Sequence, residues 1–303
     1  MGRLRTAVRT LADVDLPPEE LLTHLDDLVM HLPSDPRPEV RFESTGESGA
    51  TCLYAVYDPV SRHCSLASAG HPLPLVISPD GTQAPVPALP GPPLGIGGLP
   101  FEATELELPE GSLLALYTDG LVENRERDIG QGTAELFRVL NEPAGSLEAL
   151  CDAAMKAMLP EHRGDAAALL LARTHALSPD HVAVWDLEPD TAQVPHVRRF
   201  AVAQLLAWGL EEEAFVTELV VSELVTNAIK YGDPPIRLRL IRDDSLICEV
   251  SDASDTTPHL RRARTFDEGG RGLMLVAELP QAWGTRHTTN GKTIWCAQAL
   301  GSP

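Results

Sequence analysis

The sequence predicts an α/β protein of the α+β type with two domains, and three observations support this class. At 303 residues the chain is long enough for two hydrophobic cores. Apolar runs typical of strands fill residues 50–174, accompanied by helical segments in two groups. The composition then shifts at the linker-like stretch HALSPD, after which a second block of long helices and strands begins. We therefore expect one domain over residues 1–177 and another over residues 178–303.

In the first block, each predicted element follows from apolar periodicity and from the Pro and Gly residues that interrupt it. In chain order these elements are helices over residues 4–11 and 15–32, a loop over 33–49, two strands around a turn within 50–72, a strand over 72–78, a Pro- and Gly-rich structured loop or flap over 78–98, two strands within 101–120, a helix over 146–159 and a buried strand over 166–174.

The second block is predicted in the same way. Its elements are a strand over residues 181–190, helices over 195–210 and 211–232, strands within 236–252, a short helix over 272–279 stopped by Pro280, and a hairpin over 283–300. The pair Asn290-Gly291 is a strong signal for a type I′ turn in that hairpin.

Composition limits the classes of partner. The net charge of −20 at pH 7 argues against binding to a phosphate backbone, so no nucleic acid is expected, whereas ATP needs only a few placed groups and a cation. Five cysteines without Cys-x-x-Cys spacing are typical of reduced thiols in a cytoplasmic protein. No stretch approaches the roughly 20 apolar residues that span a bilayer, so no membrane partner is expected.

The helix predicted over residues 211–232 carries a polar pair. Glu223 and Asn227 are four residues apart and therefore share one face of the helix. Lys230 continues this stripe, which lies beside an apolar one. A stripe of this composition is as typical of a solvated helix face as of a binding site.

Two later features favour the binding site. A buried strand ends at Asp252, where a carboxylate can accept a hydrogen bond from the exocyclic amine of adenine. Gly269, Gly270 and Gly272 stand at the mouth of the next helix, where backbone amides can approach phosphates and the helix N-terminus favours an anion. Glycines alone also make ordinary turns, so the order of the three features is the more specific signal.

The stretches ELVTNAIKYG, VSDAS and GGRGLMLV resemble the GHKL ATPase family, whose Bergerat fold is a mixed sheet covered by helices, and within it the anti-sigma-factor serine kinases. The resemblance covers roughly residues 195–300. It implies that Asn227 binds Mg²⁺ together with ATP, that Glu223 is the general base for a substrate hydroxyl, and that Asp252 reads adenine. The phosphate-binding residues that it implies are Gly270, Arg271 and Gly272.

The first block contains a pair of carboxylates at predicted strand ends. Asp119 ends a buried strand in YTDGLVE, and Asp165 precedes the strand over residues 166–174. In a two-sheet sandwich such carboxylates can converge at one edge and hold two hard cations that activate water for phosphate hydrolysis. The structural alternative is that Asp119 makes a turn with Gly120 and Asp165 caps a strand.

The stretches CLYAVYDPVSRHCSLASAGHP, LPEGSLLALYTDGLVENR and GDAAALLLART resemble the PPM serine/threonine phosphatases, in particular the bacterial sporulation stage II E type. The resemblance runs from residue 1 to about residue 174 and implies an α/β sandwich in which Asp119 and Asp165 bind Mn²⁺ or Mg²⁺. The chain departs from the family pattern at Ala166, where an Asp or Asn is usual, and contains no Asp-x-x-Gly-His-Gly, the family's first metal-binding element. We therefore expect a partial, N-terminally truncated phosphatase domain with an incomplete metal site.

The leading hypothesis is a bacterial signalling protein of the sigma-factor partner-switching type. It joins a Mg-ATP-dependent serine/threonine kinase-like domain to a phosphatase domain with weak or no activity. Its expected partners are an anti-sigma-factor antagonist, a sigma factor or both, and a homodimer is common among related kinases. The alternative is a non-catalytic, nucleotide-sensing module that sequesters a sigma factor or its antagonist. A third option is a phosphatase that a separate N-terminal fragment completes.

Overall fold

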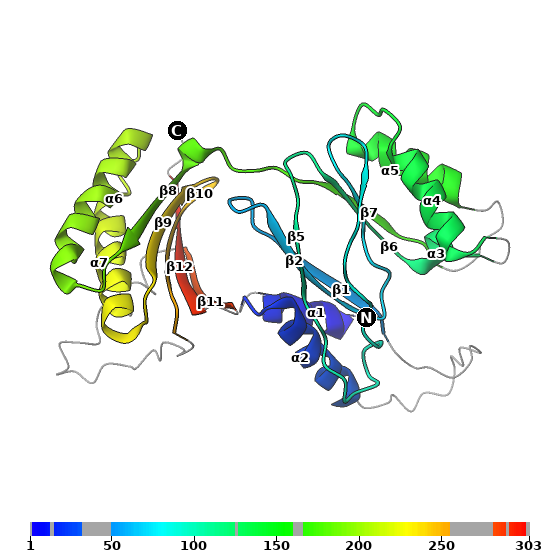
Figure 1. Cartoon of the computed structure of the whole chain (residues 1–303), viewed down its shortest axis with the longest axis horizontal. Coiled ribbons are helices and arrows are strands. Elements are labelled where there is room, and N and C mark those ends of the chain that lie inside the picture. The colour runs from blue at the N-terminus through cyan, green and yellow to red at the C-terminus, as the bar shows by residue number, and fades with distance from the viewer. Residues whose placement is uncertain are drawn as a thin grey trace. The chain divides into compact units, whose positions relative to one another are not determined.

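Figure 1 shows the computed structural model, which describes residues 2–12, 15–31, 50–124, 127–159, 166–254, 281–288 and 291–300. The chain divides into two compact units. The first comprises Met1–Val8 and Pro18–Ala176, and the second comprises Arg9–Pro17 and Leu177–Pro303. Within the described ranges, no helix is both long enough and apolar enough to cross a membrane.

Two antiparallel sheets form the centre of the first unit. The three-stranded sheet has the order β1 (Cys52–Tyr57), β2 (His63–Ala69), β5 (Thr104–Glu107). The four-stranded sheet has the order β4 (Gln83–Ala84), β3 (Leu75–Ile77), β6 (Leu113–Tyr117), β7 (Leu169–Arg173). A shared apolar cluster joins them, because Cys64 and Leu66 of β2 pack with Val76 of β3 and Leu114 of β6. The sheets therefore form a sandwich.

Helices cover the sandwich of the first unit. α1 (Gly2–Ala12) precedes α2 (Pro18–His31), which packs against β1 and β2 and buries Leu21, Leu22 and Leu25. α4 (Ile129–Leu140) and α5 (Leu147–Met158) pack against the four-stranded sheet through a cluster that includes Leu136 and Leu150. Side chains cap both helices, since Asp128 accepts a hydrogen bond from the Gln131 amide and Ser146 from the Ala149 amide.

In the described part of the second unit, one antiparallel sheet packs against two helices (Figure 1). The sheet order is β11 (Ala282–Thr288), β12 (Gly291–Ala299), β10 (Ser245–Asp252), β9 (Ile236–Arg242), β8 (Val182–Leu187). The short turns η1 (Pro179–His181) and η2 (Thr191–Gln193) precede and follow β8. α6 (Val194–Trp208) and α7 (Ala214–Tyr231) share one apolar core with alternate residues of β9, β10 and β12, so they cover one face.

Most predicted elements of the second unit are present, including the hairpin between β11 and β12. All pairings between its described strands are antiparallel, whereas we expected a mixed sheet. In the first unit, α4 has no counterpart in the prediction, and Asp119-Gly120 opens a short helix, α3 (Asp119–Val122), where a turn was expected. The predicted loop over residues 33–49 and the helix over 272–279 lie outside the described residues.

Candidate functional site

α7 carries the polar pair Glu223 and Asn227 on the border of its buried face. Leu224, Val225 and Ala228 are buried in the core, whereas Glu223 and Asn227 are only half-buried. The Asn227 Nδ2 atom is nevertheless buried, and in the described part of the chain it has no hydrogen-bond partner. A buried amide without a partner costs about 1–3 kcal/mol, and such groups usually bind water or a ligand. This unpaired amide fits a site for a bound group.

Asp252 ends β10 and is held by two donors. Its side chain is 1% exposed, and its Oδ1 atom lies 2.9 Å from the Nζ atom of Lys292. Lys292 is its direct cross-strand neighbour on β12. The Ser254 amide also donates to Oδ1, at 2.9 Å, which closes a tight turn after the strand. The carboxylate expected to read adenine is thus fixed by Lys292 of β12 and by Ser254, which follows β10.

Gly232, directly after α7, lets this helix approach Asp252. A Cβ atom at Gly232 would lie 2.5 Å from the Asp252 Cγ and 2.7 Å from the Ala228 carbonyl oxygen. Only a residue without a side chain therefore allows the end of α7 to meet the end of β10. This contact brings together the two elements that carry Asn227 and Asp252.

Lys292 and Gly232 are site residues that the sequence patterns did not predict, although a signal for Lys292 was present. Along β12, the buried core residues Ile294 and Cys296 alternate with less buried ones, and Lys292 has the same parity. A lysine at a core position of a strand requires a buried partner. The predicted phosphate-binding residues lie outside the described residues; they are Gly270, Arg271 and Gly272.

In the first unit, Asp119 begins α3 directly beyond the end of β6. It is exposed, and its Oδ1 atom accepts a hydrogen bond from the Gly120 amide at 2.8 Å. Asp165 lies outside the described residues, but the chain directly after it adjoins Thr118. The Thr118 hydroxyl donates to the Ala166 carbonyl oxygen at 3.2 Å and accepts from the Ala168 amide at 2.9 Å. The described neighbours of both candidate ligands are therefore adjacent.

His71, in the AGHP stretch after β2, lies close enough to Asp119 for that carboxylate to influence its pKa. Its Nδ1 atom is 3.1 Å from the Thr51 hydroxyl. Burial lowers the pKa of His71, and the Asp119 carboxylate and a hydrogen bond to the Tyr117 backbone oppose that shift. The AGHP stretch of the phosphatase resemblance thus places an imidazole within electrostatic range of Asp119.

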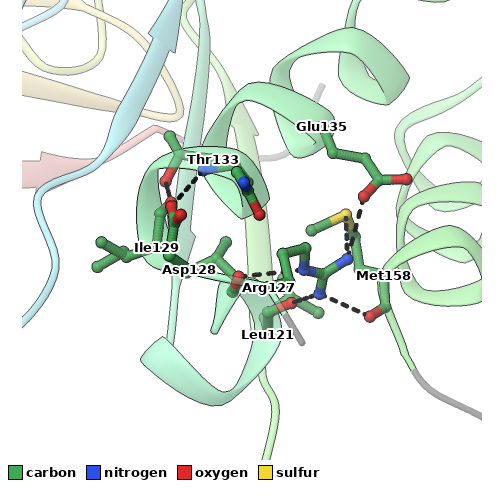
Figure 2. Close-up of polar contacts among 9 residues, drawn as sticks. Leu121, Arg127, Asp128, Ile129, Thr133, Glu135 and Met158 are labelled. Carbon is green, nitrogen blue, oxygen red and sulfur yellow. Dashed lines mark hydrogen bonds and ion pairs between the residues drawn. The ribbon is translucent and has the colours of Figure 1, made fainter. Parts of the chain in front are cut away.

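Arg127 joins the short helix that begins at Asp119 to the end of α5 (Figure 2). One guanidinium nitrogen donates to the carbonyl oxygens of Leu121, at 2.8 Å, and Met158, at 2.9 Å. The Nε atom donates to the Val122 carbonyl oxygen at 3.2 Å, and the remaining nitrogen pairs with Glu135 of α4. The side chain is 15% exposed, so these bonds are largely shielded from water. Arg127 thus fixes the position of α3.

No cluster of three or more His, Cys, Asp or Glu side chains within the described residues could hold a metal ion. A cavity of about 270 Å³ is lined by Gly111, Leu113 and Asn141, at the opposite end of β6 from Asp119. The cavity therefore has no connection with this carboxylate.

Residues 1–175, more than half of the chain, match the family model of the stage II sporulation protein E (SpoIIE). The chain belongs to the SpoIIE family. In this SpoIIE-family chain, residues 187–297 also match the model of the histidine kinase-like ATPase domain. The predicted combination of a PPM-type phosphatase domain with a kinase-like ATPase domain is confirmed.

Solved structures resemble this SpoIIE-family chain at low identity. The RsbU and RsbW domains of Rv1364c from Mycobacterium tuberculosis align with 100% of this chain and 82% of theirs, with 23% identity and a TM-score of 0.50. This likeness shows the fold, and the predicted α/β class is confirmed. The phosphatase domain of the cell fate determinant SpoIIE from Bacillus subtilis aligns with 52% of this chain and 75% of its own, with 15% identity and a TM-score of 0.35. None of these matches tests the predicted domain limits or the predicted loss of phosphatase activity, which stay predictions.

Proposed function

We propose that the second unit binds Mg-ATP and transfers its γ-phosphate to a serine or threonine of a partner protein. The observation that carries this proposal is the buried Nδ2 donor of Asn227, which has no partner among the described residues and could donate to a phosphate oxygen. It lies one helical turn after Glu223, on a helix whose end meets Asp252. A site for this reaction needs three groups. Asn227 would supply an amide oxygen for the cation, Glu223 a carboxylate for the proton, and Asp252 a fixed carboxylate for the base.

Each residue has one role in this proposal. Asn227 holds Mg²⁺ through its amide oxygen, and the cation when bound neutralises charge on the phosphates. Glu223 accepts the proton of the substrate hydroxyl while the hydroxyl oxygen bonds to the γ-phosphorus and the bond from that phosphorus to the bridging oxygen of ADP breaks. Asp252 accepts a hydrogen bond from the adenine amine. The remaining phosphate-binding residues in the proposal are Gly270, Arg271 and Gly272.

The first unit, whose phosphatase activity in this chain we expect to be weak or absent, would act on the same pathway in the opposite direction. Asp119 and Asp165 are its proposed ligands for Mn²⁺ or Mg²⁺, and its substrate would be the phosphorylated partner. We propose an anti-sigma-factor antagonist as the substrate of both units and a sigma factor as the protein that the second unit binds. The five free cysteines favour a cytoplasmic location.

The test is phosphoryl transfer from γ-labelled ATP to a candidate antagonist by the full chain. We expect Glu223→Ala to lower the transfer rate by about 100-fold or more, because a positioned base contributes about that much. ATP binding should persist. Glu218→Ala is the matched control, since Glu218 lies on the same helix and forms only a half-exposed, 3.8 Å ion pair with Arg198. Binding of ATP with no transfer by the wild-type chain would favour the nucleotide-sensing module instead.

A further inference from the structure

A buried ion pair joins the end of β10 to the start of β12. The side chains of Lys292 and Asp252 are 5% and 1% exposed, and the Nζ atom also contacts the Ser254 hydroxyl. Moving two charges out of water costs free energy that their attraction only partly returns, and apolar residues of similar size often serve stability as well. The pair therefore points to a role for the carboxylate beyond holding two strands together.

The two donors act on the same oxygen of Asp252. The Lys292 ammonium and the Ser254 amide each lie 2.9 Å from Oδ1, and no described residue donates to Oδ2. Oδ2 lies next to Gly232, where a Cβ atom would approach it to 2.7 Å. The plane of the carboxylate is thus fixed, with one oxygen engaged and the other next to a residue that has no side chain.

We propose that Lys292 is a specificity-determining positioning residue of the nucleotide site. By engaging Oδ1, Lys292 keeps Oδ2 as a fixed group that only accepts hydrogen bonds, which suits the 6-amino group of adenine. Guanine carries a carbonyl oxygen at that position, so two acceptors would face each other. The inference rests on the proposed function, because it assumes that Asp252 contacts the base.

Lys292→Met keeps the length of the side chain but removes its charge and its donors. Asp252 then loses the contact that selects one orientation, and its ability to distinguish the two purines falls. A hydrogen bond to a charged group is typically worth a factor of about ten or more in affinity. We expect the variant to bind ATP about tenfold more weakly, whereas its affinity for GTP changes by less than about twofold.

The experiment is calorimetric titration of the full chain with ATP and with GTP, in the presence of Mg²⁺. The wild type should prefer ATP by about tenfold or more, and Lys292→Met should lose most of that preference. Lys156→Met is the control for loss of one positive charge, because Lys156 is exposed on α5 in the other unit. Thermal melting without nucleotide shows whether each variant is folded.

An unchanged ratio of ATP to GTP affinity in a folded Lys292→Met chain would overturn the inference. Should that variant fail to fold, Ser254→Ala replaces it, since it removes a contact of the Lys292 ammonium and should lower the ratio in the same direction. An unchanged ratio in Ser254→Ala would then overturn the inference. A wild-type chain that binds neither nucleotide contradicts the proposed function as well, and this result is distinct from an unchanged ratio.

Discussion

Gly232 and Asp252 are in such close contact that the residue after α7 has no room for a side chain. A Cβ atom at position 232 would come within 2.5 Å of the Asp252 Cγ atom, well inside the sum of their van der Waals radii. The contact joins the helix that carries Glu223 and Asn227 to the strand that carries Asp252. It depends on a residue outside both elements.

Gly232→Ala should therefore displace Asp252. We expect a loss of unfolding free energy of about 1–3 kcal/mol, because added atoms in a packed site force backbone shifts, together with weaker ATP binding. Chemical denaturation and nucleotide titration measure the two effects. Gly145→Ala is the control, since a Cβ atom there would meet no atom within 4 Å. Equal stability of the two variants would contradict the steric argument.

Arg127→Met should destabilise the first unit by about 2–4 kcal/mol, because it leaves buried carbonyl oxygens of α3 and α5 without a donor. The amide of Glu123, which donates to the Asp119 carbonyl oxygen, should exchange its hydrogen faster. Arg138→Met provides the control, since Arg138 and its partner Glu142 are each 65% exposed and such pairs contribute less than about 1 kcal/mol. Similar losses in both variants would show that Arg127 does not fix α3.

Stability should decrease at alkaline pH. Burial raises the pKa of the Cys64 thiol from 9.0 to about 11, whereas the unfolded chain deprotonates near the ordinary value. The contribution of this protonated thiol is fully present below pH 9.0 and is lost as the pH rises to about 11, with a slope of at most about 1.4 kcal/mol per pH unit. Urea unfolding at several pH values measures it. Cys64→Ala should lower the slope, and an unchanged slope would assign the effect to other groups.

The chain by itself should hydrolyse phosphoproteins weakly or not at all with Mn²⁺. The described residues around Asp119 provide no cluster of three metal-ligating side chains, and the 303 residues contain no Asp-x-x-Gly-His-Gly. Phosphate release from a phosphorylated antagonist, followed over a range of Mn²⁺ concentrations, tests this expectation. Rapid hydrolysis that Asp119→Ala abolishes would show that the site is complete.

Local patterns predicted the elements of the second unit well. Alternating apolar residues define β9, β10 and β12, and helical spacing with a Gly after the last turn defines α7, so these signals lie within single elements. The sequence patterns did not predict helix α4. It contains two glycines, which lower helix propensity, but Gly132 allows α4 to pass so close to α3 that a Cβ atom would lie 1.8 Å from the Val122 carbonyl oxygen. Packing against α3, and not helix propensity, therefore accounts for the glycine at position 132.

In the candidate sites, too, the sequence patterns identified residues within one element but not the residues that position them from another element. Glu223, Asn227, Asp252 and Asp119 were predicted because residue type and position within one element indicate their chemistry. The residues that position them, Lys292 and Arg127, act across the sheet or between helices. Lys292 is 40 residues from Asp252, and Arg127 bonds to carbonyl oxygens of two other helices rather than to its own element, so apolar periodicity read along the chain does not identify these contacts.

The buried Nδ2 donor of Asn227, which finds no partner in the described part of the chain, also bears on how long the protein survives. A fold that leaves a buried polar group without a partner is less stable alone than with a ligand that satisfies that group. If Mg-ATP is that ligand, at 100 times its dissociation constant it would add about 2.7 kcal/mol to the free energy of unfolding. Proteases act on opened chains, so degradation of the second unit would then speed up when ATP is scarce. The abundance of the protein would thereby follow the energy supply of the cell.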